Sequence, residues 1–217
     1  MKTRLVIFDF DGTLADTTAT ILATYRMTIE AVGAEPRSDQ QVRATIGLPL
    51  KEGFRQLFPQ FSEEQLDRCT DTYREIFEEN RARLSPKLFP GVADTLAELD
   101  RRGIAMSVAS SRSNASLMDF CREHGMDRYM KLVLGADSVT RAKPDPEPVL
   151  ITLRQLGVAP EEAVVVGDMP VDIAMGRGAG CRTVAVTYGN ASRADLAEAG
   201  ATHIIDHFPD LLPLLTD

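Results

Sequence analysis

From about residue 87 onward, the chain alternates between short apolar segments rich in β-branched residues and longer segments with helical periodicity. The short segments are strand candidates and lie at 104–109, 131–134, 163–166, 183–186 and 203–205. Helical periodicity fills the intervals, at about 92–102, 114–124, 146–156, 171–177 and 193–199, and a leucine-rich helix follows the last strand. Strands that alternate with helices in this way form βαβ units, which build a parallel sheet covered by helices on both faces. With one more strand at 4–8, we predict a doubly wound α/β fold.

The segment between the first predicted strand and residue 87 differs, because it is helical almost throughout. Apolar side chains recur at helical spacing in two runs, Ile21, Leu22, Tyr25, Ile29 and Val32, then Leu66, Cys69, Tyr73, Ile76 and Phe77. Ser-x-x-Gln capping boxes begin at Ser38 and Ser62, and no strand candidate intervenes. We therefore predict an α/β core of residues 1–14 and 87–217, with a small all-helical domain of residues 15–86 inserted after the first strand.

Composition and charge narrow the classes of partner. The 217-residue chain has a formal net charge of −8 and no basic stripe to neutralise nucleic-acid phosphates, so we expect no nucleic-acid partner. The apolar run at 5–8 is too short for a signal-peptide core or a membrane span, so we expect no membrane association. Three cysteines, Cys69, Cys121 and Cys181, lie far apart and are expected to be reduced core thiols. These features predict a cytoplasmic protein.

Acidic residues follow two of the predicted strands at their carboxyl ends, where ligands bind in an open parallel sheet. Asp9 and Asp11 follow the strand at 4–8, and Asp168 and Asp172 follow the strand at 163–166. Carboxylates that converge at short range repel one another unless a cation lies among them. Hard oxygen ligands with room for water suit Mg²⁺. The sequence therefore predicts a Mg²⁺ site formed by these four residues.

A metal-bound carboxylate can also attack phosphorus, giving an acyl phosphate that water hydrolyses. We expect Asp9 to be this nucleophile. We expect Asp11 to be the acid–base group, because the leaving alkoxide needs a proton and the attacking water must later lose one. The transferring phosphoryl group also needs donors, and the candidates are the loop residues Gly12 and Thr13, the hydroxyls of Ser110 and Ser111, and the ammonium of Lys143. A small phosphorylated metabolite is the expected substrate.

Four motifs in this order resemble those of the haloacid dehalogenase superfamily of phosphotransferases. Asp9 to Leu14 (DFDGTL) is similar to its first motif, Ser110 to its second, Lys143 to its third, and Gly167 to Asp172 (GDMPVD) to its fourth. The resemblance implies a Rossmann-like core and a helical cap, formed by the insert, that closes over the site. It also implies that Asp9, the backbone carbonyl of Asp11 and Asp168 hold Mg²⁺, with Asp172 assisting through water or by orienting its neighbours.

Within the superfamily, three segments are similar to phosphoglycolate phosphatases and their near relatives: 46–50, 89–91 and 204–211. The second motif departs from that group, since Ser110-Ser111-Arg112 stands where many of its members carry Thr-Asn-Lys. This departure leaves the substrate open. In the insert, Lys51 is the expected substrate contact, ahead of Arg43 and Arg55, because it follows a Gly-x-Pro turn.

Asp11 separates the remaining activities of the superfamily. Dehalogenases do not need a second aspartate, and phosphonoacetaldehyde hydrolases replace it, so Asp11 disfavours both. A hexose-phosphate mutase keeps every core motif and remains the alternative. We therefore expect a Mg²⁺-dependent phosphatase that hydrolyses a small phosphomonoester, with phosphoglycolate the first candidate, through an aspartyl-phosphate intermediate. The sequence gives no basis for predicting an oligomeric state.

Overall fold

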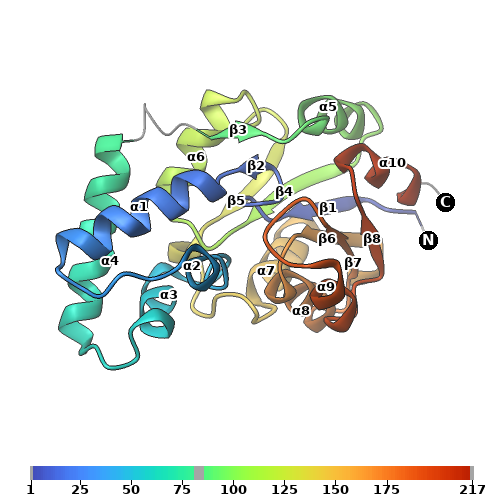
Figure 1. Ribbon diagram of the computed structural model, residues 1–217. Coiled ribbons are helices and arrows are strands. Elements are labelled where there is room, and N and C mark those ends of the chain that lie inside the picture. Colours follow the sequence, from blue (N-terminus) through green and yellow to red (C-terminus); the bar gives the residue numbers. More distant parts are fainter. Residues whose placement is uncertain (1, 81–85, 216–217) are drawn as a thin grey trace.

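The structure, a computed structural model, describes residues 2–80 and 86–215 of the chain. A sheet of six parallel strands, in the order β5-β4-β1-β6-β7-β8, forms its centre (Figure 1). The strands are β1 (Leu5–Phe8), β4 (Ala105–Ala109), β5 (Met130–Leu134), β6 (Ala163–Gly167), β7 (Arg182–Val186) and β8 (His203–Ile205). Each predicted strand is confirmed, and its bounds lie within about one residue of those expected.

Helices cover both faces of this sheet, as predicted. They are α5 (Val92–Arg101), α6 (Asn114–Glu123), α7 (Glu147–Leu156), α8 (Pro170–Gly178), α9 (Arg193–Glu198) and α10 (Leu211–Leu214). Alternate residues of β1 point to opposite faces. Val6 and Phe8 belong to the hydrophobic cluster of α5, α6 and α10, whereas Leu5 and Ile7 belong to that of α7 and α8. Figure 1 shows these two groups of helices above and below the sheet.

The strand order places β1 at the centre of the sheet and at the point where the order reverses. Counted along the chain, the six strands run 3-2-1-4-5-6, which is the doubly wound Rossmann arrangement. Phe8 is in register with Val108 of β4 and Val166 of β6. The loops that follow these three strands therefore begin side by side, and the motifs that they carry converge.

In the described part of the insert, residues 15–80 and 86, the chain forms four helices: α1 (Thr18–Ala31), α2 (Asp39–Arg43), α3 (Leu50–Leu57) and α4 (Glu63–Asn80). They gather to one side of the sheet (Figure 1, left) around a hydrophobic cluster of their own. The ring of Tyr25 lies 4.8 Å from that of Phe54 and 5.1 Å from that of Tyr73, measured between centroids. The division into two domains at residues 14 and 86 stays a prediction, and residues 81–85 of the insert lie outside the described residues.

One expectation about the insert was wrong, namely that it contains no strand. Ala15–Asp16 forms β2, which pairs antiparallel with β3 (Lys87–Leu88) at the other end of the insert. A two-residue strand is too short to show periodicity, and its partner lies about 70 residues away in the chain. No local sequence pattern therefore predicts it. The pair ties the two connections of the insert to each other.

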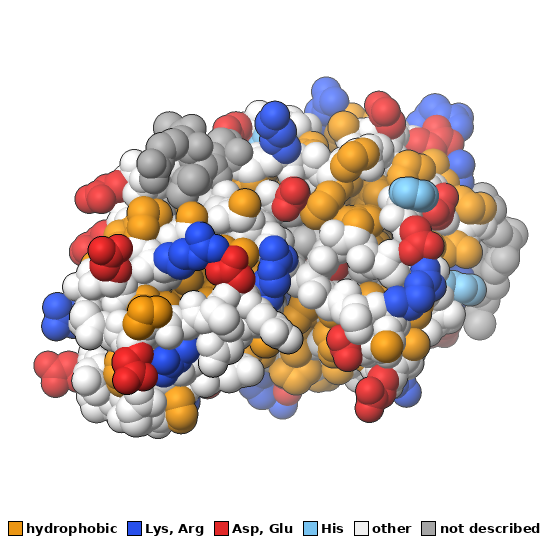
Figure 2. Space-filling view, viewed as in Figure 1, with side chains coloured by type: hydrophobic (Ala, Val, Ile, Leu, Met, Phe, Trp, Pro, Cys, Tyr) orange, Lys and Arg blue, Asp and Glu red, His pale blue; other side chains and the backbone are white. Residues whose placement is uncertain are grey.

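Cys69, Cys121 and Cys181 are buried free thiols, as predicted. On the face shown in Figure 2, acidic and basic side chains are interspersed. Among residues 2–80 and 86–215, no helix has both the length and the apolarity needed to cross a bilayer.

Leu96 provides a test of the packing on the α5 face. It is fully buried in the cluster that α5 forms with the sheet, whereas Leu150 of α7 is 43% exposed. We expect Leu96→Ala to lower the free energy of unfolding by about 2–5 kcal/mol, because it leaves a cavity. The matched change Leu150→Ala should shift it by less than about 0.5 kcal/mol. Urea unfolding followed by circular dichroism measures both, and equal effects would contradict the packing described.

Candidate active site

The carboxyl ends of β1, β4 and β6 bring together polar side chains that are almost fully buried. Asp9 follows β1, Ser110 follows β4, and Asp168 follows β6. Lys143 reaches the same place from the loop before α7, and it is only 4% exposed. The structure thus brings together the four predicted motifs from segments far apart in the sequence. Burial of so many ionisable groups is costly unless they satisfy one another.

Three carboxylates and one ammonium form the centre of the site. Asp9, Asp168 and Asp172 each place an oxygen within 4.8 Å of the others, and all three are buried. The Lys143 ammonium donates to Asp9 and, at 2.6 Å, to Asp172. Three carboxyl groups therefore face one ammonium. Hard oxygen donors with this excess of negative charge fit a divalent cation, which would restore the balance.

The ionisation of these groups follows from burial and from their mutual repulsion. Burial raises the pKa of Asp9 well above its usual range; Lys143 opposes this shift, and Asp172, Asp168 and Asp11 add to it. Burial and the charge of Asp172 raise the pKa of Asp168 to about 7. Burial disfavours the charge of Lys143, but Asp172 and Asp9 outweigh it and raise the pKa of the ammonium above its ordinary value. Lys143 therefore carries a positive charge in the site.

Asp168 is held by residues that the sequence did not single out for this purpose. Its Oδ2 accepts hydrogen bonds from the backbone N–H of Asn190 at 2.7 Å and from Nδ2 of Asn190 at 3.0 Å. Its Oδ1 accepts from the Thr13 hydroxyl at 3.1 Å. Asn190 accepts in turn from the hydroxyl of Thr18, at the start of α1, at 3.0 Å. Asn190 lies in the loop after β7, so the rule that located the other site residues also applies to it.

Gly12 makes room for this arrangement. Its φ is +83°, and a Cβ atom at this position would lie 2.3 Å from Oδ2 of Asp168. Its backbone N–H donates to the carbonyl of Ala15, and that of Thr13 donates to the carbonyl of Phe10. The structure thus shows both residues forming the turn after Asp9 and, through the Thr13 hydroxyl, supporting Asp168. Their predicted contact with phosphate stays a prediction.

The second motif connects the core with the insert and with Asp11. The Ser110 hydroxyl accepts from the backbone N–H of Arg112 at 3.3 Å. The Ser111 hydroxyl donates to the carbonyl of Gly47, in the insert, at 2.6 Å. Nε of Arg112 donates to both carboxylate oxygens of Asp11 at 2.9 Å each. The Asp11 carboxylate therefore lies against Arg112 and outside the carboxylate cluster, which leaves its backbone carbonyl as the predicted metal ligand.

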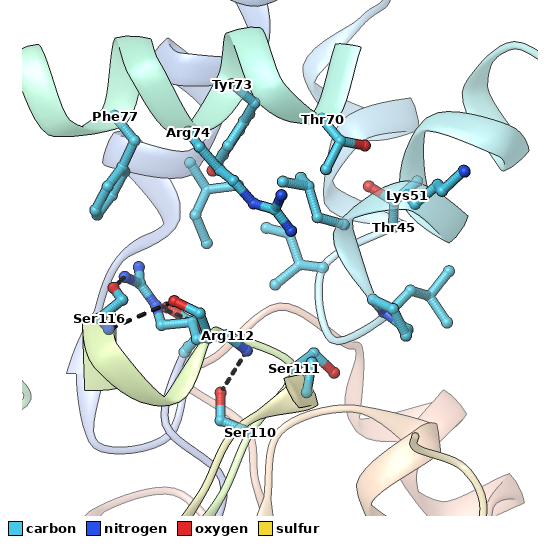
Figure 3. A pocket seen from close by; sticks show the side chains of 18 of the residues that line it. Thr45, Lys51, Thr70, Tyr73, Arg74, Phe77, Ser110, Ser111, Arg112 and Ser116 are labelled. Carbon is cyan, nitrogen blue, oxygen red and sulfur yellow. Dashed lines mark hydrogen bonds and ion pairs between the residues drawn. The ribbon is translucent and has the colours of Figure 1, made fainter. Parts of the chain in front are cut away.

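A cavity of about 700 Å³ opens between these residues and the insert. Figure 3 shows it with Ser110, Ser111 and Arg112 on the core side and with Tyr73, Arg74 and Phe77 of α4 on the opposite side. Lys51 also lines the cavity, but its ammonium is bound by Asp67 and Glu63 of α4. Its predicted role as a substrate contact stays a prediction. Arg74, which the sequence did not single out, directs its side chain into the cavity (Figure 3).

Comparison with known proteins gives consistent similarities along the chain. Residues 6–186 match the family described as haloacid dehalogenase-like hydrolase. The chain is 31% identical to phosphoglycolate phosphatase 1 of Pseudomonas aeruginosa, over 97% of this chain and 79% of that protein. It is 29% identical to pyrophosphatase PpaX of Bacillus cereus, over 100% of this chain and 98% of that protein. A crystal structure of a haloacid dehalogenase-like hydrolase from Bacteroides fragilis has a TM-score of 0.91 and 30% identity, over 97% of this chain and 100% of that one.

The hydrogen bonds to Asp168 generate a prediction about cation binding. Asn190→Ala should weaken binding of a divalent cation about 10- to 100-fold, because Asp168 loses a partner that orients its carboxylate. Titration with Mn²⁺, followed by electron paramagnetic resonance, measures the affinity. Asn114→Ala is the matched control, since its side chain donates to the carbonyl of Val133 instead. Equal Mn²⁺ affinity in the wild type and both variants would show that Asn190 does not position Asp168.

Proposed function

The chain belongs to the haloacid dehalogenase-like hydrolases and is a phosphatase, and on this premise we propose that it hydrolyses a small phosphomonoester with Mg²⁺ through an aspartyl-phosphate at Asp9. One observation carries the proposal, which is the buried group of Asp9, Asp168, Asp172 and Lys143 at the carboxyl end of the central strand. Three carboxylates beside one ammonium can hold Mg²⁺ and, together with it, a phosphoryl group.

In the first step, a carboxylate oxygen of Asp9 attacks phosphorus and the bond between phosphorus and the ester oxygen breaks. Asp11 donates a proton to the departing oxygen, so that an alcohol leaves. Lys143 and the Ser110 hydroxyl would stabilise the negative charge on the phosphoryl oxygens. When bound, Mg²⁺ supplies further positive charge next to the same oxygens.

In the second step, water attacks the phosphorus of the aspartyl-phosphate. Asp11, now a carboxylate, accepts a proton from this water, and the bond between phosphorus and Asp9 breaks. Inorganic phosphate leaves, and both aspartates return to their starting states. Because Asp11 makes an ion pair with Arg112 in this structure, its carboxylate must leave Arg112 and take up a proton from solvent before the first step. The second step returns a proton to it from the attacking water.

The helical insert, residues 15–86, would act as a cap that excludes bulk water during phosphoryl transfer. The hydrogen bond from Ser111 to Gly47 and the cavity between the second motif and α4 support this role. Two basic residues of the insert, Lys51 and Arg74, line this cavity, which also supports recognition of the leaving group from the insert side. Lys51 remains a candidate for this contact, together with Arg74.

Phosphoglycolate is the first substrate to test, because one relative is named for its hydrolysis, whereas another is named a pyrophosphatase. The experiment is phosphate release from phosphoglycolate, sugar phosphates, nucleotides and pyrophosphate, with and without Mg²⁺. Mg²⁺-dependent release from a phosphomonoester supports the proposal. A sugar phosphate that isomerises without releasing phosphate would indicate the hexose-phosphate mutase instead.

Asp9→Asn tests the nucleophile. The amide cannot form an acyl phosphate in the same way, so we expect phosphate release to fall by at least about a thousandfold. Circular dichroism should show an unchanged fold. Asp100→Asn, an exposed change in α5, serves as the control and should keep full activity. Substantial phosphate release by Asp9→Asn would remove Asp9 from this role.

Mg²⁺ affinity should depend on pH through Asp168. The pKa of this carboxyl is about 7 before the metal binds, so below that pH a proton competes for the same oxygens. We expect the apparent affinity to fall by up to about tenfold per pH unit as the pH drops below 7, and to level off above it. Calorimetric titration with Mg²⁺ at pH 6, 7 and 8 measures this. An affinity that is constant over this range would contradict the coupling.

A further inference from the structure

Arg112 forms an ion pair with Asp11, the proposed acid–base group, but has no role of its own in the proposed function. Its Nε donates to both oxygens of Asp11 at 2.9 Å. The Arg112 side chain is 11% exposed and that of Asp11 is 13% exposed, so the pair is largely shielded from water. The two residues are separated by about 100 positions in the sequence and meet only because β1 and β4 are neighbours in the sheet.

The surroundings of Arg112 hold its guanidinium in place independently of Asp11. Nη1 donates to the hydroxyl of Ser116, on α6, at 3.1 Å. The guanidinium also lies over two aromatic rings, 5.6 Å from the centroid of Phe10 and 5.1 Å from that of Phe77. Phe77 belongs to α4, so the position of Arg112 is complete only with the insert in place (Figure 3). Arg112 therefore stays where it is when Asp11 moves.

The movement of Asp11 would leave this guanidinium without its counter-ion. Asp11 has to turn from Arg112 towards the ester oxygen at Asp9 and take up a proton from solvent before it can act as the acid. A shielded cation that loses the carboxylate it is paired with is strongly disfavoured, unless another anion replaces that carboxylate. Among the described residues, Nη2 of Arg112 has no hydrogen-bond partner, so Nε and Nη2 are available to a planar carboxylate.

The substrate can supply the replacing anion. Arg112 lines the same cavity as Asp9 and Asp11, and its backbone N–H donates to the Ser110 hydroxyl, a proposed phosphate donor. An anionic group close to the ester oxygen of the substrate would therefore lie within reach of the guanidinium. The transferring phosphoryl group itself belongs with Lys143 and the metal, which leaves Arg112 for a group on the leaving alcohol.

We propose that Arg112 binds a carboxylate on the leaving group of the substrate, and that this carboxylate displaces Asp11 and so frees it for proton transfer. The inference rests on the proposed function and names its substrate class as phosphate esters of small hydroxy acids, with the carboxylate one or two carbons from the ester oxygen. A cavity of about 700 Å³ accommodates members of this class larger than glycolate. Esters without the carboxylate leave Asp11 bound to Arg112 and react slowly.

The experiment compares 2-phosphoglycolate with its neutral isostere 2-phosphoglycolamide, as kcat and KM for each. Wild-type protein should favour the carboxylate compound about 10- to 100-fold in kcat/KM. Arg112→Met should lose this preference through a raised KM for phosphoglycolate. It should also raise kcat for the amide, because Asp11 is no longer held. Arg112→Lys should recover part of the preference, since it keeps the charge without the planar fork.

Two further variants separate recognition from general damage. Arg122→Met, an exposed change on α6, should leave both substrates unaffected. Arg74→Met changes a candidate contact of the leaving group on the insert side, so it should lower kcat/KM for both compounds by a similar factor. It should therefore keep their ratio, because Arg74 pairs with Asp71 and not with Asp11. Equal losses for both compounds in Arg112→Met would assign Arg112 a structural role and overturn the inference. Loss of the preference in Arg74→Met alone would overturn it as well.

Binding to the Asp9→Asn variant distinguishes this inference from the proposed function. If wild-type protein released phosphate from no ester, the proposed function would fail. Calorimetric titration of Asp9→Asn with the same two compounds still tests Arg112. Tighter binding of phosphoglycolate, lost when Arg112→Met is added, supports the carboxylate site. Equal binding of the two compounds would exclude it.

Discussion

Lys143 lies buried between the carboxylates of Asp9 and Asp172, and the rest of the site is arranged around this contact. An ammonium buried to this degree would be strongly disfavoured alone, and so would either carboxylate. The ammonium offsets part of the cost of burying the two carboxylates, but Asp168 brings a third carboxylate that Lys143 cannot balance. Burial and the nearby charge of Asp172 raise the pKa of Asp168, as expected where carboxyl groups outnumber the cations. A site of this kind is suited to a divalent cation and to the anionic group that the cation attracts.

The parallel sheet makes this contact possible. Because β1 is flanked by β4 and β6 in register, three loops begin at the same level and their polar residues converge. Gly12 allows the turn after Asp9 to pass close to Asp168, where a side chain would collide with the carboxylate. The insert begins directly after this turn and returns through the β2–β3 pair. The chemistry at the end of β1 and the cover over it are thus linked by a few residues of backbone.

Much of this could be predicted from the sequence, for a definite physical reason. Strand periodicity and the rule that ligands bind at the carboxyl ends of parallel strands suffice to bring Asp9, Asp168 and Lys143 into one group. The partners of these residues could not be predicted in the same way. The ion pair between Arg112 and Asp11 and the hydrogen bonds from Asn190 to Asp168 depend on side-chain directions in loops that only the folded chain brings together. The β2 strand could not be predicted for a similar reason, since its partner strand lies at the far end of the insert.

The claim that Asp9 carries the phosphoryl group is open to direct chemical observation. Borohydride reduces an acyl phosphate to an alcohol, so rapid quenching with borohydride during turnover converts a phosphorylated aspartate into homoserine. Peptide mass spectrometry then locates the modified residue. The account predicts homoserine at position 9, dependent on substrate and Mg²⁺, and at none of the other site aspartates. Steady phosphate release without reduction at Asp9, or reduction at another aspartate, would contradict it.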